Sequence, residues 1–266
     1  MTSGPLLILS VMTLCGIMAA AWLMQRSTGH HGWADVFWPF GVGAVGVATV
    51  LLSNAPVSPA RKYLVAGLLA AWSLRLGSHI LFRTLGSDDD PRYAKLREEW
   101  GDAANTRMFL FLQSQALAGV VLVACVYLAA ARPETKLEWG DYIGALIMMT
   151  ALGGEAIADS QLKNFNKDPA NRRKVCNSGL WRWSRHPNYF FEWLAWVSYV
   201  LVAADFGGGY VVGWLSLAAP VLMYVLLRHI SGVPPLEQHM MATRPDFRDY
   251  QRRTSVFFPL PPRGRS

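Results

Sequence analysis

The chain has 266 residues, of which 52% are apolar and 16% charged, and its mean hydropathy is positive. Because the apolar residues come in long blocks, this composition argues against a soluble protein with buried helices, whose unbroken apolar stretches rarely exceed about 14 residues. The formal net charge is +7, and the cations are distributed unevenly along the chain.

Seven of the apolar blocks are long enough to cross a bilayer as helices. The hydrocarbon core is about 30 Å thick, so a helix that rises about 1.5 Å per residue needs roughly 20 residues to span it. The pattern predicts an all-α fold, with residues 1–266 forming a single transmembrane domain of seven membrane helices. In chain order the blocks are 6–24, 34–52, 63–82, 108–130, 142–158, 189–204 and 210–227.

The first block is predicted to be a retained membrane helix. A cleaved signal peptide starts with a positively charged segment, and residues 1–5 contain no Lys or Arg.

The cations predict how the helices are oriented. Seven helices place the two ends of the chain on opposite sides, and most of the 25 Lys and Arg residues then fall on the side that carries the C-terminus. The opposite side has only Arg61, Lys62, Arg132 and Lys136. Cytoplasmic loops are enriched in Lys and Arg, so the pattern predicts an outer N-terminus and a cytoplasmic C-terminus. The basic face would attract anionic lipid headgroups or a phosphate-bearing ligand.

Two sets of ionisable residues occur at spacings of four, in or next to the third and fifth blocks. Residues four apart share one face of a helix, so each set forms a polar stripe. The sets are Arg75, His79 and Arg83, and Glu155, Asp159 and Lys163. Charged groups in a bilayer cost about 2.5–3.5 kcal/mol each, so they face a partner or a cavity. Both interpretations stay open: the stripes pair and hold the bundle together, or they line a polar cavity that opens toward the basic face.

The three cysteines, Cys15, Cys125 and Cys176, form no CxxC pair, and the Cys and His spacing gives no zinc signature. No metal site is therefore expected. The sequence also lacks a GxGxxG motif, so a dinucleotide site would not be of the Rossmann type.

Polar residues are densest in the segment 179–193, GLWRWSRHPNYFFEW. Proline is tolerated in the first turn of a helix, so the sixth helix is predicted to begin near Pro187. This start puts Asn188 and Glu192 one turn apart on one face. The N–H groups of such a helix start, with Arg182, Arg185 and His186 close by, suit a phosphate group.

This RHPNYxxE arrangement resembles the C-terminal region of the membrane steroid 5α-reductase family, most closely its bacterial branch of uncharacterised proteins known as DUF1295. The resemblance extends over residues 75–260 and includes PLE at 235–237 and RPDFRDY at 244–250. It implies a multi-pass protein of a bacterial inner membrane.

The resemblance also implies an activity. In that family NADPH binds among the last helices and the cytoplasmic loops, and a hydride passes to the β-carbon of an enone. NADPH is therefore the expected cofactor, and the expected substrate is a steroid-like or isoprenoid lipid. Membrane lipids are the other expected partners, with no nucleic acid and no obligate protein partner. The candidate cofactor-binding residues are Arg83, Glu155, Asp159, Arg173, Lys174, Arg185, His186, Asn188, Glu192, Glu237 and Tyr250.

The chain departs from the animal 5α-reductases in one respect. Those enzymes carry a Gln-Glu pair near the second helix and a Tyr on the third, and neither occurs here around residues 53–54 or 78–83. Reduction of an enone still needs a group that stabilises the enolate or donates a proton. His79, Tyr93 and Asp35 are the candidate catalytic residues, in that order, on chemistry alone.

Two other functions are compatible with the sequence. Membrane methyltransferases of the isoprenylcysteine or phospholipid type share a related RHPxY motif and use S-adenosylmethionine, but their tails carry an adjacent Glu pair where this chain has Leu236-Glu237. A non-enzymatic lipid-binding or transport protein would use the polar stripes for structure only.

Overall fold

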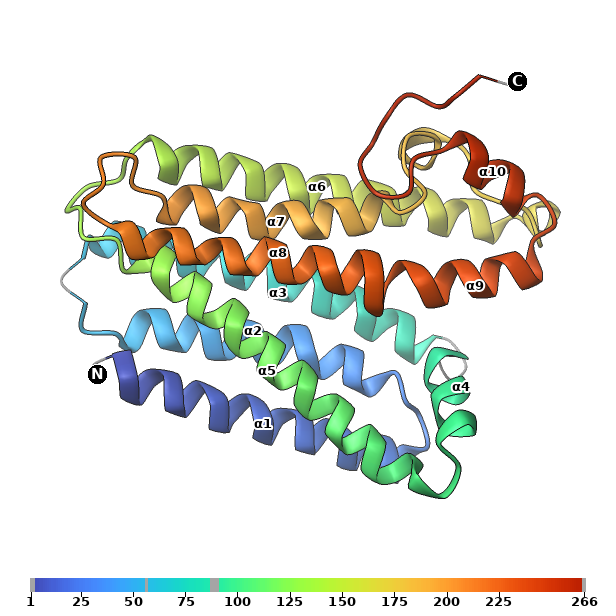
Figure 1. Ribbon diagram of the computed structural model, residues 1–266, viewed down its shortest axis with the longest axis horizontal. Helices are drawn as coiled ribbons and strands as arrows, with labels where there is room; N and C mark the ends of the chain where they lie inside the picture. The colour runs from blue at the N-terminus through green and yellow to red at the C-terminus, as the bar shows by residue number, and fades with distance from the viewer. Residues whose placement is uncertain (1–2, 56, 87–90, 265–266) are drawn as a thin grey trace. The chain divides into compact units, whose positions relative to one another are not determined.

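The computed structural model describes residues 3–55, 57–86 and 91–264, without the side chains of residues 3 and 91–95 (Figure 1). These residues are 79% helical and contain no β-strand, so the predicted all-α fold is confirmed. The α-helices are α1 (Ser3–Thr28), α2 (Trp33–Leu52), α3 (Pro59–Leu85), α4 (Pro91–Trp100), α5 (Ala104–Ala130), α6 (Trp139–Lys167), α7 (Pro187–Ala203), α8 (Ala218–Val225), α9 (Val233–Thr243) and α10 (Phe247–Arg253). Short 3-10 segments η1 (Gly101–Ala103), η2 (Pro169–Asn171), η3 (Gly179–Arg182) and η4 (Val211–Leu217), and the π-helical η5 (Leu226–Ile230), join them.

Six helical segments in the described part of the chain are long and apolar enough to cross a membrane. They are Gly4–Thr28, Trp33–Leu52, Pro59–Leu85, Leu96–Ala130, Trp139–Lys167 and Val211–Thr243. The chain is thus a multi-pass membrane protein. The remaining predicted block coincides with α7, which is only 17 residues long, so the prediction of seven spans stays open.

Two of the predicted helices end later than their apolar blocks do. The fifth block was expected to end at residue 158, but α6 continues to Lys167. The seventh was expected to end at residue 227, but helical structure resumes after η5 and includes Glu237, which the sequence placed in a tail. Pro234 and Pro235 stand at the start of α9, where a missing N–H costs little, so the helix restarts there after the π-helical turn.

The chain divides into two compact units, one formed by Met1–Ala145 with Tyr199–Ala219 and the other by Leu146–Ser198 with Pro220–Ser266. In the first unit α2 packs closely on α3, and α5 runs obliquely along α1 and α2 (Figure 1). Glycines allow this approach: a Cβ atom on Gly43 would lie 2.1 Å from Oγ of Ser73, and one on Gly77 would lie 2.6 Å from the ring of Phe40. Small residues serve the same purpose in other membrane helix pairs.

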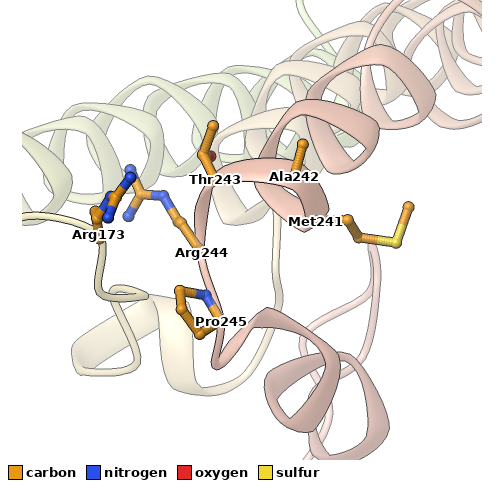
Figure 2. A pocket seen from close by; sticks show the side chains of 6 residues that line it. All are labelled: Arg173, Met241, Ala242, Thr243, Arg244 and Pro245. Carbon is orange, nitrogen blue, oxygen red and sulfur yellow. The ribbon is translucent and has the colours of Figure 1, made fainter.

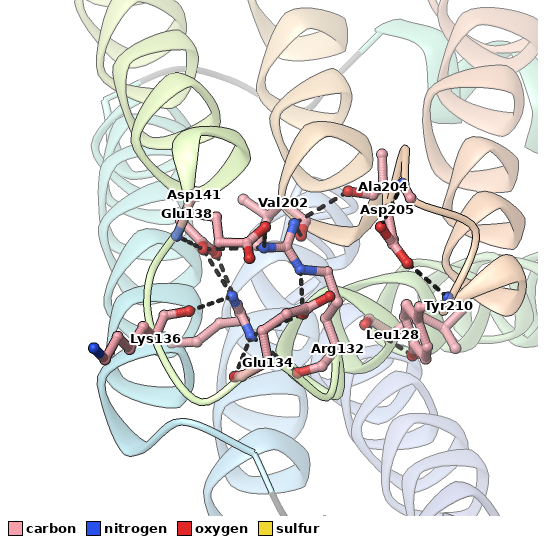
Figure 3. A network of polar contacts seen from close by, with 12 residues as sticks. Leu128, Arg132, Glu134, Lys136, Glu138, Asp141, Val202, Ala204, Asp205 and Tyr210 are labelled. Carbon is pink, nitrogen blue, oxygen red and sulfur yellow. Dashed lines mark hydrogen bonds and ion pairs between the residues drawn. The ribbon is translucent and has the colours of Figure 1, made fainter.

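A buried charge network in the first unit joins the start of α3 to the α5–α6 connection (Figure 3). Arg61 and Asp141 are both fully buried, and Nε and Nη2 of the arginine donate to the two carboxylate oxygens at 2.9 Å. Arg132, 1% exposed, donates through Nη1 to the carbonyl oxygens of Val202 and Ala204 at 3.1 Å, which ties the end of α7 to the same network.

The same network satisfies the other donors of its two arginines. Nη1 and Nη2 of Arg61 also donate to the carbonyl oxygens of Arg132, Glu134 and Lys136 at 2.8–2.9 Å. Nε of Arg132 donates to Glu134 at 2.7 Å, and its Nη2 donates to Glu138 at 3.1 Å. Buried charges are tolerated when they are paired and hydrogen-bonded in this way, so we interpret the network as structural.

In the second unit the C-terminal tail, residues 254–264, folds back onto the loop that precedes α7. The N–H group of Arg185 donates to the carbonyl oxygen of Ser255 at 2.8 Å, and that of Leu260 donates to the carbonyl oxygen of Trp183 at 3.0 Å. Aromatic rings then cover the contact, with Phe257 5.2 Å from Tyr224 and 6.1 Å from Trp193 between ring centroids. The tail thus fixes the position of the RHPNY segment.

Candidate functional site

The RHPNY segment forms a sharp turn that leads into α7, and the helix begins at Pro187 as the sequence predicted. Ser184 stabilises the turn from inside the protein: it is fully buried, its Oγ accepts a hydrogen bond from the N–H group of His186 at 3.1 Å, and it donates to the carbonyl oxygen of Phe257 at 2.8 Å. The backbone that carries the polar side chains of the motif is therefore held in place by buried hydrogen bonds.

Glu237, on α9, gathers three polar side chains from two other segments. Its Oε1 accepts hydrogen bonds from Nε of Arg185 at 2.7 Å and from Nε2 of His186 at 3.0 Å. Its Oε2 accepts from Nε2 of Gln251 at 2.8 Å and from Nη2 of Arg185 at 3.4 Å. Because the guanidinium and amide groups can only donate here, the carboxylate is an acceptor throughout, and Nε2 of His186 must carry its hydrogen.

Arg185 uses its remaining donor on the backbone. Its Nη1 donates to the carbonyl oxygens of Gln251 at 3.0 Å and Thr254 at 2.8 Å. Arg185, predicted to lie beside a phosphate, and Glu237, a candidate cofactor-binding residue, therefore bind each other in this structure, and Arg185 also binds the tail. Their arrangement holds α9, α10 and the RHPNY turn together.

His186 keeps one ring atom unused. The residue is 1% exposed, its ring stacks on that of Tyr189 at 5.4 Å between centroids, and its Nδ1 has no hydrogen-bond partner among the described residues. Burial lowers the pKa of His186, and the charges of Arg185 and Arg228 lower it further against the opposing effect of Glu237. The ring is thus a neutral imidazole near pH 7, with its lone pair on Nδ1.

Asn188 and Glu192 lie one turn apart on α7, as predicted from the position of Pro187. Glu192 is 5% exposed and its Oε1 accepts a hydrogen bond from Nε1 of Trp196 at 3.0 Å, whereas Asn188 is half-buried. A buried carboxylate next to a half-buried amide can orient a polar ligand group.

Tyr250 has a structural role in this region. Its hydroxyl group donates to the carbonyl oxygen of Trp181 and lies 3.3 Å from that of Ser184, so α10 is fixed to the turn before α7. The side chain is 3% exposed, and burial raises the pKa of Tyr250. The predicted role of Tyr250 in cofactor binding is not evident from these contacts.

Arg173 and Lys174 lie in the loop between η2 and η3, and both are exposed. Arg173 has a φ of +68°, in the left-handed region, which is uncommon for a residue with a side chain. Arg244, from the segment after α9, donates through Nη1 to the carbonyl oxygen of Lys174. An open pocket of about 210 Å³ lies at this junction (Figure 2), and it is lined by Arg173, Met241, Ala242, Thr243, Arg244 and Pro245.

The acidic stripe is on α6, where Glu155 is 4% exposed and Asp159 is half-buried. One turn of this helix also holds the RHPNY region in place. Nε1 of Trp181 donates to the carbonyl oxygen of Ala158, and Oε1 of Gln161 accepts from the N–H group of Leu180, both at 2.9 Å. The acidic residues thus belong to the same unit as the motif.

The candidate catalytic residues belong to the first unit. Asp35, in the first turn of α2, forms an ion pair with Arg83 at 3.8 Å. His79 lies half-buried on α3 between Arg75 and Arg83, so that stripe is helical as predicted. Tyr93 is in α4, and its side chain lies outside the described residues.

Several residues of the region were not identified from the sequence. Gln251 and Ser184 were not selected as site residues because neither side chain is charged, although Ser184 lies in the segment 179–193. Arg244 belongs to the RPDFRDY segment, but nothing in the pattern places it beside Lys174, 70 positions earlier. In the part of the chain that the structure describes, no group of three or more His, Cys, Asp and Glu residues could hold a metal ion.

The fold and this cluster define a multi-pass α-helical membrane protein with a hydrogen-bonded polar region in its C-terminal unit. The chain belongs to the DUF1295 family of proteins of unknown function, whose model matches residues 21–254. It is 35% identical over 265 residues to an uncharacterised protein of the fission yeast Schizosaccharomyces pombe, in a match that covers 90% of this chain and 75% of that protein. No solved structure matches the chain.

Proposed function

We propose that the protein is a membrane-embedded, NADPH-dependent reductase that acts on the enone double bond of a steroid-like or isoprenoid lipid. NADPH would supply the hydride that adds to the β-carbon of the enone. The observation that carries the proposal is the RHPNYxxE turn, which starts α7 at Pro187 and presents Asn188 and Glu192 one turn apart. This is the motif by which the chain resembles the steroid 5α-reductase family.

The residues around the turn fit a charged, hydrogen-bonding cofactor. Glu192 offers a buried carboxylate and Asn188 a half-buried amide, which can bind the ribose or amide groups of a dinucleotide. The guanidinium groups of Arg173 and Arg244 line an open pocket in the same unit, where phosphate oxygens can bind. We assign cofactor binding in this unit to Glu155, Asp159, Arg173, Lys174, Asn188 and Glu192, with Arg185, His186, Glu237 and Tyr250 as their structural support.

The proton that completes the reduction must come from a side chain or from water. His79 is the preferred donor among the candidates, because an imidazole can release a proton near neutral pH. Asp35 is a weaker candidate, since its carboxylate already forms an ion pair with Arg83 at 3.8 Å.

We further propose seven membrane spans, with α7 as the shortest, an outer N-terminus and a cytoplasmic C-terminus, in a bacterial inner membrane. The positive charge of the C-terminal side supports this orientation. A short helix can cross where the bilayer thins locally or where neighbouring helices cover its ends.

Binding of NADPH to the full chain, purified in detergent, tests the proposed function. NADPH should raise its melting temperature, and Glu192→Gln should lower NADPH affinity about 10-fold, since a hydrogen bond to a charged group is lost. Glu98→Gln changes an exposed carboxylate on α4 and should leave the affinity unchanged. Oxidation of NADPH on addition of enone lipids would then establish the reaction. Stabilisation by S-adenosylmethionine in place of NADPH would instead indicate a lipid methyltransferase.

A further inference from the structure

The pocket at the end of α9 has an unusual charge environment (Figure 2). Its lining includes two arginines that are 71 positions apart in sequence, Arg173 from the loop after η2 and Arg244 from the segment after α9. No carboxylate of the described residues forms an ion pair with either guanidinium group. Two like charges thus line one pocket, with no counterion among the residues that the structure describes.

Convergence of this kind is unfavourable for the chain alone. Two cations in close proximity repel each other, and partial burial lowers the pKa of Arg244 because it disfavours the charged form. Arg244 is nevertheless held in place, since its Nη1 donates to the carbonyl oxygen of Lys174. The other N–H groups of its guanidinium can bind a ligand.

The backbone conformation of Arg173 is also unfavourable for the chain. A non-glycine residue at a φ of +68° is strained, because its Cβ atom lies too close to the following carbonyl oxygen. The turn that holds it is well defined, because the N–H group of Lys174 donates to the carbonyl oxygen of Asn171 at 2.9 Å. Strained residues with side chains are concentrated at ligand-binding sites.

The size and chemistry of the pocket limit its occupant. At about 210 Å³ it is smaller than the roughly 300–1,000 Å³ pockets that enclose whole drug-sized ligands, so it suits one substituent of a larger ligand. Guanidinium groups bind phosphate through paired N–H···O contacts. We propose that Arg173 and Arg244 form a binding site for a phosphate monoester.

Two sources can supply this group. The first is the phosphate on the adenosine ribose that distinguishes NADPH from NADH, in which case the site sets cofactor preference and the inference rests on the proposed function. The second is the phosphomonoester headgroup of a lipid such as phosphatidate. Both present the same dianionic group, and the experiment separates them.

Binding of adenosine 2′,5′-bisphosphate and of adenosine 5′-monophosphate to the full chain would be compared by calorimetry. The site predicts that the bisphosphate binds about 10-fold or more tightly than the monophosphate, because it adds charge-assisted hydrogen bonds. Arg244→Gln should remove that difference. Arg252→Gln is the matched control, because Arg252 is an exposed arginine that pairs with Asp249 at 3.1 Å, and it should keep the difference.

The lipid arm uses nanodiscs of phosphatidylcholine with or without phosphatidate. Stabilisation by phosphatidate that Arg244→Gln abolishes, without nucleotide discrimination, would assign the site to a lipid and count against NADPH. Equal binding of NADPH and NADH by the wild type and Arg244→Gln, with no phosphatidate effect, would overturn the phosphate site and leave the reductase proposal standing. If neither nucleotides nor phosphatidate bind, both proposals fail.

Discussion

The guanidinium group of Arg185 binds the carboxylate of Glu237 through Nε at 2.7 Å and Nη2 at 3.4 Å, although 52 positions separate the two residues. The pair joins the RHPNY turn to α9, inside the helical segment Val211–Thr243 that is apolar enough to cross a membrane. A largely buried charge needs a partner, and Glu237, the partner of Arg185, also binds His186.

Loss of the Glu237 carboxylate should destabilise the C-terminal unit. Glu237→Gln leaves the largely buried guanidinium of Arg185 without its counter-charge, and breaking such a pair costs about 3–5 kcal/mol. A clear fall in melting temperature is expected for the purified chain. Asp249→Asn removes an exposed carboxylate that pairs with Arg252 and should cost less than about 1 kcal/mol. Equal effects of the two substitutions would contradict a structural role for Glu237.

His186 should make stability depend on pH in a defined direction. Its pKa is lowered in the folded chain, whereas a free histidine titrates near 6.5. Between these two values the unfolded chain binds more protons, so the free energy of unfolding should fall as the pH is lowered below about 6.5. His186→Gln, whose amide can still donate to Glu237, should lose this component when melting temperatures are compared from about pH 7.5 to about pH 5.5.

The ionisation state of His186 can be observed directly. Nitrogen-15 NMR of histidine-labelled protein should show Nε2 protonated and Nδ1 unprotonated at neutral pH, because Nε2 donates to Glu237. A protonated Nδ1 at neutral pH would show that the ring is an imidazolium and would remove the basis of the pH prediction.

The pair of Arg61 and Asp141 tests the interpretation of the network in the first unit. Both side chains are fully buried, so Asp141→Asn should destabilise the chain by about 3–5 kcal/mol. Replacing both residues together, Arg61→Met with Asp141→Leu, should cost less than Asp141→Asn alone, since no charge is left unpaired by that substitution. Glu134→Gln should lower the stability less than Asp141→Asn does, because the side chain of Glu134 is 26% exposed. A double variant that is less stable than Asp141→Asn would contradict this account.

The strained backbone at Arg173 allows binding to be separated from stability. Glycine adopts a positive φ without steric cost, so Arg173→Gly should leave the free energy of unfolding within about 1 kcal/mol of the wild type. It should still weaken binding of adenosine 2′,5′-bisphosphate, because one guanidinium group is lost. A variant that unfolds easily would show that Arg173 is a structural residue.

Sequence patterns were sufficient to predict six of the long apolar helices and the residue at which α7 begins. Long apolar runs locate six candidate spans because each must match the bilayer, and Pro187 marks the beginning of α7 because proline is favoured in a first turn. The helix that carries Glu237, α9, was not predicted. It follows a π-helical turn and starts with Pro234 and Pro235, a pattern that does not indicate a continuing helix.

Pairing between distant residues could not be predicted in the same way. The sequence assigned Arg61 only to one side of the membrane, and the structure shows it fully buried against Asp141, 80 positions later. The sequence also could not show that Arg185 and His186 both bind Glu237. A charge in a sequence shows that a partner or solvent is needed, and only the tertiary structure shows which partner supplies it.

The central claim is that the C-terminal unit binds NADPH. Equilibrium binding of NADPH and of S-adenosylmethionine to the purified full chain, measured side by side with the wild type and Glu192→Gln, tests it most directly. NADPH alone should bind saturably to the wild type, and Glu192→Gln should weaken this binding about 10-fold. Binding of S-adenosylmethionine in its place, or no binding of either compound by a folded chain, would contradict it.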